Sequence, residues 1–238
     1  MKRVALITGA SRGLGKTLAT FLAGRGDNLV ITARGVEALT TVAGELEAYG
    51  GEVVALPGDV ADPSHQRQLV AAAGQLGGLH LLVNNASVLG PSPQPVLADY
   101  PLETLEQVFA VNVLAPLSLI QQALPLLKQS GGTIINISSD AAVGGYAGWG
   151  GYGASKAALD LITLTLANEL REDGVAVVSV DPGDMRTQMQ QEAFPGEDIS
   201  DRPLPDVTIP FWAWLLGQEP RQISGRRFQA QAAEWVVA

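Results

Sequence analysis

Residues 8–15 read Thr8-Gly9-Ala10-Ser11-Arg12-Gly13-Leu14-Gly15, a glycine-rich turn near the start of the chain. The segment Arg3–Thr8 before it, apolar from Val4 to Ile7, predicts a strand, and Leu14–Arg25 after it predicts a helix. Glycines let the chain turn sharply and let phosphates approach the backbone at the helix N-terminus, where unpaired N–H groups and the helix dipole favour an anion. The strand-turn-helix context therefore indicates a phosphate-binding turn.

The same turn runs into Gly15-Lys16-Thr17, which is similar to the end of a P-loop of nucleotide triphosphatases. That motif needs its first glycine at position 10, where this chain has Ala10, and Gly9 leaves five intervening residues instead of four. A P-loop-like NTPase is therefore a remote alternative. We expect Lys16 and Thr17 to be ordinary residues of the first helical turn.

Short apolar segments alternate with amphipathic ones along the rest of the chain. We expect strands at Leu29–Ala33, Glu52–Leu56, Leu79–Val83, Thr133–Ile137 and Val175–Val180, and helices at Val36–Tyr49, Asp62–Leu76, Thr104–Val113, Pro116–Lys128 and Tyr152–Glu172. Strands that are apolar on both faces are typical of a parallel sheet covered by helices on each side. We predict an α/β fold, a single doubly wound Rossmann-type domain over residues 1–238 with a parallel sheet of about seven strands.

Prolines mark two places where regular structure should change. Pro125 should bend or end the helix that contains it. Beyond Pro182, residues 184–210 carry four prolines among interspersed charges and are expected to form a long loop. Loops of that length in a compact domain are usually lids or binding segments, so we expect this region to border the substrate.

Composition and charge exclude several classes of protein. The 238-residue chain has no cysteine, which excludes disulfide scaffolds, Cys-ligated metal sites and thiol nucleophiles. A net charge of −9 without a basic cluster opposes binding to nucleic acid or to an anionic membrane. No uninterrupted apolar run reaches the roughly 18 residues that span a bilayer, and the apolar run after Met1-Lys2-Arg3 is too short for a signal peptide. We expect a soluble, cytoplasmic protein.

Histidine and aromatic residues are weaker candidates for a site. His65 and His80 are the only histidines and lack carboxylates at ligand or triad spacing, so neither a metal site nor a His-based hydrolase is expected. Trp212 and Trp214 should pack in the core or between subunits. Tyr146 and Trp149 lie in a glycine-rich loop and are expected to line a substrate pocket.

The end of the second expected strand indicates which dinucleotide would bind. NAD-binding folds commonly place an acid there, about 20 residues past the glycine turn, to hold the ribose 2′-hydroxyl. This chain instead has Arg34, which can reach a 2′-phosphate together with Arg12 of the turn. NADP(H) is therefore the preferred cofactor, and NAD(H) remains an alternative.

Six further motifs follow in order along the chain: Gly58-Asp59-Val60, Asn84-Asn85-Ala86, Asn112, Ser138-Ser139, Tyr152-Gly153-Ala154-Ser155-Lys156, and Pro182-Gly183 with Thr187. Each is weak alone, but their joint occurrence is highly specific. Together with residues 8–15, these motifs show a resemblance to the short-chain dehydrogenase/reductase family of the TGxxxGxG and YxxxK type. The resemblance extends from Arg3 to about Phe228. The resemblance implies an oxidoreductase that moves a hydride between NADP(H) and a small or medium carbonyl or alcohol substrate. It also implies a homo-oligomer, a dimer or tetramer.

The motifs and the resemblance together define a candidate cofactor site. Asp59 would meet the adenine, Asn85 and Ala86 the ribose, and the Pro182 segment the nicotinamide amide, by resemblance. The full set of candidate cofactor-binding residues is Gly9, Ser11, Arg12, Gly13, Leu14, Gly15, Arg34, Asp59, Val60, Asn85, Ala86, Tyr152, Lys156, Pro182, Gly183, Met185 and Thr187.

Four residues are the candidate catalytic groups. Tyr152 suits the acid/base role, because Lys156 lies four residues on, on the same helical face, and a cation there favours the phenolate. Ser139 would donate to the substrate oxygen; it is chosen over Ser138 because it precedes Tyr152 by thirteen residues, as in the family. Asn112 would join a proton relay through water and Lys156, by resemblance alone.

The chain departs from the family pattern at two places. Ser87 follows Asn84-Asn85-Ala86 where glycine is usual, and its side chain could alter the backbone or crowd the nicotinamide. The tail, residues 224–231, lacks the usual Asp-Gly-Gly after its strand. A catalytically idle NADPH-binding sensor or scaffold is the alternative function, although the complete catalytic set argues against it.

Overall fold

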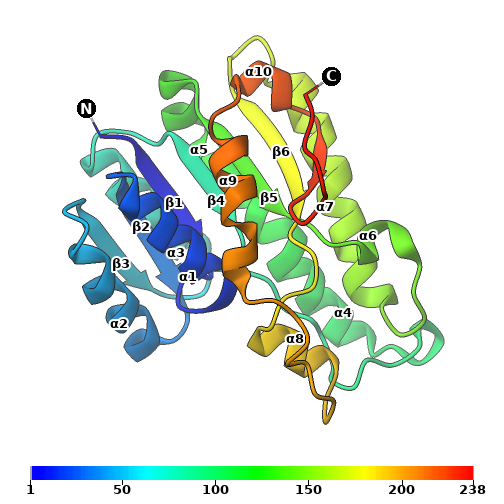
Figure 1. Ribbon diagram of the computed structural model, residues 1–238. Coiled ribbons are helices and arrows are strands. Elements are labelled where there is room, and N and C mark those ends of the chain that lie inside the picture. The colour runs from blue at the N-terminus through cyan, green and yellow to red at the C-terminus, as the bar shows by residue number, and fades with distance from the viewer. Residues whose placement is uncertain (1, 238) are drawn as a thin grey trace.

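One sheet of seven parallel strands forms the centre of the computed structural model, which describes residues 2–237 (Figure 1). The strands lie in the order β3-β2-β1-β4-β5-β6-β7, so the chain winds outward from β1 in one direction and then, from β4, in the other. The predicted single doubly wound α/β fold is confirmed. The strands are β1 Val4–Thr8, β2 Asn28–Ala33, β3 Val53–Pro57, β4 Leu81–Asn84, β5 Thr133–Ile137, β6 Ala176–Asp181 and β7 Arg227–Gln229.

The six strands located from sequence agree with the structure to within about two residues at most ends, because each is a compact apolar run. The seventh, β7, was not located. It has only three residues, of which Phe228 alone is buried and apolar, so it carries no recognisable periodicity. It pairs with β6 through Arg227 opposite Ser179 and Gln229 opposite Asp181.

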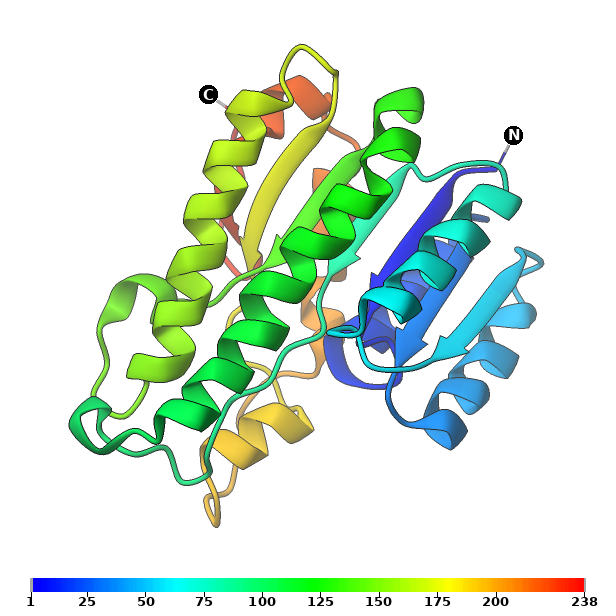
Figure 2. The same ribbon diagram turned by 180° about the vertical axis from the view of Figure 1, so that it is seen from behind.

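Helices cover both faces of the sheet, and each face has its own apolar core (Figures 1 and 2). On one face lie α1 (Gly13–Gly24), α2 (Val36–Glu47) and α9 (Ile209–Leu215). On the other lie α3 (Pro63–Gln75), α5 (Ala115–Ser130) and α7 (Gly150–Glu169). The carboxyl ends of all seven strands therefore point to one edge, where loops can build a site.

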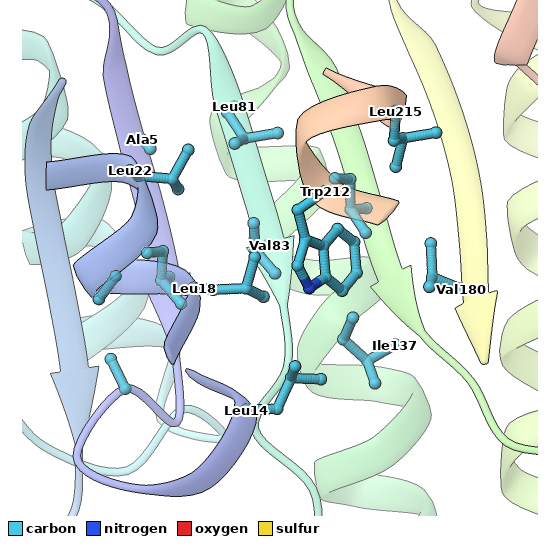
Figure 3. Packing of buried hydrophobic residues seen from close by; sticks show 14 of the residues in the cluster. Ala5, Leu14, Leu18, Leu22, Leu81, Val83, Ile137, Val180, Trp212 and Leu215 are labelled. Carbon is cyan, nitrogen blue, oxygen red and sulfur yellow. The ribbon is translucent and has the colours of Figure 1, made fainter. Parts of the chain in front are cut away.

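Trp212 of α9 fills the centre of the first core (Figure 3). Its side chain is fully buried and lies among Leu18 of α1, Val83 of β4 and Val180 of β6. The indole Nε1 donates a 2.8 Å hydrogen bond to the Thr208 hydroxyl, so burial leaves no unpaired donor. Core packing was one of the two roles expected for this residue.

The two helices predicted at Thr104–Val113 and Pro116–Lys128 form one continuous run. It consists of α4 (Leu102–Phe109), the π turn η2 (Ala110–Leu114) and α5. Pro125 was expected to bend or end its helix, but the helix does not end there. Helix α5 continues to Ser130 and stops at Gly131, which adopts a left-handed conformation. Pro125 lies on the exposed side of α5, where water can satisfy the carbonyl that loses its helical partner.

The run Leu102–Ser130 is also long and apolar enough, by length and composition, to cross a membrane. In the structure 44% of its most apolar window is buried in the protein, and Leu119, Ile120 and Ala123 are fully buried against the sheet. The core helices of globular proteins often have this composition, so it does not point to a membrane.

The segment 184–210 is more ordered than the predicted long loop. It contains α8 (Gln188–Ala193), and it ends in η3 (Pro205–Thr208), which leads into α9. The Thr187 hydroxyl caps α8 by accepting from the Gln190 N–H, and Pro205 occupies the first turn of η3, where a missing N–H costs nothing. The other short elements are η1 (Leu97–Asp99), α6 (Ala141–Gly144) and α10 (Pro220–Ile223).

Candidate active site

A large cleft of about 1450 Å³ opens at the carboxyl ends of the strands. Every candidate cofactor-binding residue lines it, from the glycine turn to Thr187, and so do the catalytic candidates Ser139, Tyr152 and Lys156. Asn112 is the exception, because it is fully buried behind the cleft wall. The fold thus brings together residues that lie up to 178 positions apart in the chain.

The turn after β1 is a cradle that only glycine can form. Gly9 has φ +68°, and a Cβ there would lie 2.9 Å from the Ala86 Cα. A Cβ on Gly15 would overlap the carbonyl oxygen of Gly9. The start of α1 therefore presents bare backbone N–H groups to the cleft, which fits the phosphates of a dinucleotide.

Asn85 holds this cradle in place. Its side-chain amide donates to the Thr8 carbonyl at 2.8 Å and to the Gly9 carbonyl at 3.2 Å. The Thr8 hydroxyl in turn accepts from the N–H groups of Asn85 and Ala86, both at 2.9 Å. Asn85 thus lines the cleft where expected, but its amide nitrogen is used to tie β1 to the end of β4.

Lys16 and Thr17 face away from the cleft. The Lys16 ammonium forms a 2.7 Å ion pair with Glu45 of α2, and the Thr17 hydroxyl donates to Asp206 at 3.1 Å. Neither residue lines the cleft, so neither can meet a terminal phosphate bound there. This placement removes the sequence argument for an NTPase.

The two arginines expected at the 2′-phosphate differ in their surroundings. Arg34 follows β2, is exposed and lines the cleft, and within residues 2–237 it forms no hydrogen bond or ion pair. Arg12 instead donates a hydrogen bond to the Gln188 side chain at the start of α8. Asp59, expected to meet the adenine, is exposed, and its carboxylate accepts from the Ala61 N–H at 2.8 Å.

Tyr152 and Lys156 lie on the first turns of α7 with their side chains toward the cleft. Both are almost completely buried, at 7% and 2% exposure. The Lys156 ammonium donates to the Ile137 carbonyl at 2.8 Å and lies 5.4 Å from the centre of the Tyr152 ring. The four-residue spacing thus sets the pair side by side, as expected.

Their titration differs from the expectation that Lys156 would lower the pKa of Tyr152. Burial raises the pKa of Tyr152; a hydrogen bond with the Ser87 hydroxyl opposes this, and the charges of Asp181 and Asp140 add to it. Burial also lowers the pKa of Lys156 to about 8, with Asp160 opposing. Loss of water is the largest influence on the pKa of both groups, so the phenol is protonated at neutral pH, as a proton donor must be.

The two serines after β5 have different environments. The Ser139 hydroxyl is partly exposed, donates to Asp140 at 3.1 Å and accepts from the Ala141 N–H at 3.2 Å. The Ser138 hydroxyl is buried without a hydrogen-bond partner, although Ser138 also lines the cleft. Ser139 can therefore reach a substrate from the mouth, and both residues stay candidates for contact with it.

Asn112 occupies the π turn η2, an irregularity often found at functional sites and not detectable from the sequence. Its side-chain oxygen accepts from the Val88 N–H at 2.9 Å and the Ser87 hydroxyl at 3.0 Å. Its amide group donates to the Val88 carbonyl at 2.9 Å and the Ser155 hydroxyl at 3.1 Å. An amide has two donors and two acceptor positions, so the side chain is fully hydrogen-bonded within the protein, and the relay through water and Lys156 stays a prediction.

Ser87 fits its position without strain. No residue other than glycine within 2–237 has a positive φ, so the Ser87 backbone does not require glycine. Its hydroxyl donates to the Asn112 side-chain oxygen at 3.0 Å and lowers the pKa of the Tyr152 phenol. The departure from the family pattern therefore adds a hydroxyl beside the candidate acid.

Sequence analysis did not identify Arg227 of β7, which supports the site from behind. Its guanidinium donates to the Ser139 carbonyl at 2.8 Å, to Asp160 at 3.0 Å and to Asp181 at 3.2 Å. Farther along the tail, Gln231 donates to the carbonyls of Pro182 and Asp184. No local pattern predicts these contacts, because Arg227 and Ser139 are 88 positions apart in the chain.

The remaining candidates have local roles or line the cleft. His65 shares a 2.8 Å hydrogen bond with the Thr32 hydroxyl, and His80 accepts from the Val4 N–H. Burial lowers the pKa of each imidazole, and no group of three metal-ligating side chains occurs among the described residues. Tyr146 and Trp149 line the cleft, where the sequence placed them.

Comparison with known proteins identifies the family. Residues 3–198 match the sequence model of the short chain dehydrogenase family. A rhamnolipid-biosynthesis 3-oxoacyl-acyl-carrier-protein reductase from Pseudomonas aeruginosa is 36% identical over 227 residues, covering 91% of this chain and 85% of that protein.

Solved structures give the same result. A short chain dehydrogenase from Shigella flexneri, complexed with NADP, has a TM-score of 0.89 at 31% identity and covers 97% of both chains. One from Escherichia coli, complexed with NADPH, has a TM-score of 0.88 at 32% identity, also over 97% of both chains. The chain belongs to the short-chain dehydrogenase/reductase family of oxidoreductases.

Proposed function

We propose that this oxidoreductase uses NADP(H) to interconvert a carbonyl compound and the corresponding alcohol, of small or medium size. The observation that carries the proposal is the buried pair Tyr152 and Lys156, which faces the same cleft as the bare glycine cradle. A sensor or scaffold would have no need of a buried phenol and ammonium side by side, since burying them costs free energy.

Two observations support NADP(H) over NAD(H). Arg34 lines the cleft at the end of β2 without any ionic partner among the described residues, so its guanidinium is available to a 2′-phosphate. Solved relatives from S. flexneri and E. coli are complexed with NADP and NADPH. The glycine cradle accommodates the pyrophosphate of either dinucleotide.

The residues divide the chemistry between them. The bound cofactor supplies the hydride for reduction and accepts it in oxidation. Tyr152 donates a proton to the oxygen on which negative charge develops, and Ser139 donates a hydrogen bond to that oxygen from the cleft mouth. Lys156 holds positive charge beside the phenol and stabilises the phenolate left after proton transfer.

Tyr152→Phe tests the proposal, because it removes the proton and keeps the ring. We expect turnover of carbonyl and alcohol panels to fall by about 10²-fold or more, while NADPH binding, measured by nucleotide fluorescence, stays near the wild-type value. Tyr49→Phe, at an exposed tyrosine outside the cleft, is the matched control. Unchanged activity of Tyr152→Phe would reject the assigned acid, and a wild type that binds NADPH but turns over nothing would favour the sensor.

A further inference from the structure

Aromatic and aliphatic side chains form one wall of the cleft beside the reacting end. The ring of Trp149 meets that of Tyr152 edge-on at 6.0 Å between centres and lies 6.0 Å from the ring of Phe194. Leu89 is buried against Tyr152 in the same small cluster. Trp149 comes from the loop before α7 and Phe194 from the end of α8, so the two segments together present an apolar surface to the body of a substrate.

Hydroxyl groups mark where a polar atom of the substrate would sit. Ser138 is 2% exposed, lines the cleft and has no hydrogen-bond partner for its hydroxyl. A buried hydroxyl without a partner costs free energy, and a carbonyl or alcohol oxygen between the end of β5 and Tyr152 would remove that cost. The reacting oxygen thus has its own polar contacts, and the rest of the substrate has to match the surrounding wall.

Carboxylates ring this end of the cleft. Asp140 follows Ser139, Asp184 follows the Pro182 turn, and Glu192 lies on α8; all three are exposed and line the cleft. The negative charges of Asp140 and Asp184 also affect Tyr146, which lies between β5 and α7. A hydrogen bond to Asp140 raises the pKa of Tyr146, and the charges of Asp140, Asp181 and Asp184 raise it further.

Among the described residues that line the cleft, no cation forms an ion pair with Asp140, Asp184 or Glu192. The cleft-lining cations are Arg12, Arg34 and Lys156, of which Arg34 lies at the far end and Lys156 is buried against the Ile137 carbonyl. Arg12 bonds to Gln188, whose amide group donates to Glu192 at 2.8 Å.

Arg202 lies outside the cleft lining; its hydrogen bond to Asp201 raises the pKa of its guanidinium, and the charge of Asp184 contributes. It forms a 2.6 Å ion pair with Asp201, and its guanidinium lies over the ring of Phe194, 5.5 Å from the ring centre. An anionic substrate would therefore meet Asp140 and Glu192 without an ion-pair partner, and Asp184, which Arg202 offsets only in part because Arg202 is paired with Asp201.

We propose that this site selects uncharged or cationic carbonyl compounds with an aryl or similarly apolar body, and that Asp140 and Asp184 exclude carbonyl compounds that carry a carboxylate or phosphate. The inference rests on the proposed reductase function. It adds to that function the charge and polarity of the substrate class. The apolar wall supplies binding energy, and the carboxylates supply discrimination by like-charge repulsion.

Three para-substituted benzaldehydes of similar size test the inference: 4-carboxybenzaldehyde, 4-formylbenzamide and 4-formyl-N,N,N-trimethylanilinium. For the wild type with NADPH we expect kcat/KM for the carboxylate to be at least about tenfold below that for the isosteric amide, and the cation to react at least as well as the amide. Added salt should narrow the gap, because it screens charges at the open mouth.

Charge-removing variants separate this effect from the intrinsic reactivities of the aldehydes. Asp140→Asn and Asp184→Asn should each reduce the amide-to-carboxylate ratio by about threefold or more, and the double variant should reduce it further. Asp140 accepts a hydrogen bond from the Ser139 hydroxyl, so Asp140→Asn changes the contacts of a candidate catalytic residue as well as the charge. Asp184 has no such bond to Ser139, so Asp184→Asn changes the charge without disturbing that residue. Glu169→Gln, an exposed acid at the far end of α7, changes the net charge equally and should leave the ratio unchanged.

Binding of each aldehyde to the NADPH complex, measured by calorimetry, gives a readout that needs no turnover. Tighter binding of the amide than of the carboxylate, without turnover of any compound, would refute the reductase proposal and support the charge inference. Equal or better binding and turnover of the carboxylate would overturn the charge inference and leave the reductase proposal standing. A ratio that Glu169→Gln changes as much as Asp184→Asn would also overturn it.

Discussion

Arg227→Met removes the charge behind the active site and keeps a flexible apolar stem of similar length. Arg227 forms ion pairs with Asp160 and Asp181, whose side chains are 17% and 5% exposed. Its guanidinium also donates a hydrogen bond to the Ser139 carbonyl. After the substitution, the nearly buried Asp181 carboxylate keeps only the Gly183 N–H as a partner. We therefore expect a loss of stability and a displaced Ser139.

The size of the effect follows from the burial of the pair. Removing one partner of a buried ion pair costs about 3–5 kcal/mol, since the remaining charge stays in a site of low polarity. Arg227 is 25% exposed, so water screens part of the interaction and the lower end, about 3 kcal/mol, applies. For a chain of this size each kcal/mol shifts Tm by roughly 2–4 °C, which predicts a fall of roughly 6–12 °C.

The loss of stability in Arg227→Met should be larger at high pH than at low pH. Burial raises the pKa of Asp181, and Arg227 lowers it, so the variant raises it further above its unfolded-state value. A carboxyl group with a raised pKa binds its proton more tightly when folded, so the destabilisation shrinks as pH falls through that pKa. The drop in Tm should therefore be larger near about pH 8 than near about pH 5.

Scanning calorimetry of the purified variant at both pH values, together with kcat, measures these effects. Arg227→Met with Asp181→Asn should recover part of the stability, because no charge is then left unpaired. Arg221→Met, at an exposed arginine of α10, is the matched control and should stay within about 0.5 kcal/mol of wild type. A fall in Tm of less than about 2 °C, or one that is equal at both pH values, would refute the reasoning.

Three further substitutions test the cofactor and catalytic residues. Arg34→Asp should raise KM for NADPH by about 10-fold or more, with little change for NADH, because a charge-assisted bond to the 2′-phosphate is lost; an equal loss for both cofactors, in the same initial-rate assays, would exclude that contact. Ser139→Ala should lower kcat by about 10²-fold and more than Ser138→Ala does, and the reverse order would assign the oxygen contact to Ser138. Ser87→Ala removes a hydroxyl that lowers the pKa of Tyr152, so the pH profile of alcohol oxidation should move to higher pH, and an unmoved profile would contradict the role of that hydroxyl.

Much of the site could be predicted because its signals are local. The glycine turn, Tyr152 and Lys156 each depend on spacing within one strand-turn-helix unit or one helix, and the structure places them together on one cleft. Ala10, at the position where the P-loop of an NTPase needs its first glycine, was enough to argue against that motif. The ion pair of Lys16 with Glu45 agrees with this argument.

The expected pKa of Tyr152 was wrong for a physical reason. Spacing shows that Lys156 is near, but the pKa depends on how much water both groups lose and on where the ammonium points. The sequence also does not show the surroundings of Asn112, whose four side-chain hydrogen-bonding positions are all occupied by neighbours from two other segments.

Local sequence patterns thus determine the doubly wound fold, the dinucleotide cradle and the Tyr152–Lys156 pair, because hydrophobic period and residue spacing act over a few turns of chain. Contacts between distant segments needed the tertiary structure. They include the support of Ser139 by Arg227, the carboxylates around the substrate end and the helices within 184–210. Which charges face each other depends on strand order and packing, and no short stretch of residues encodes either one.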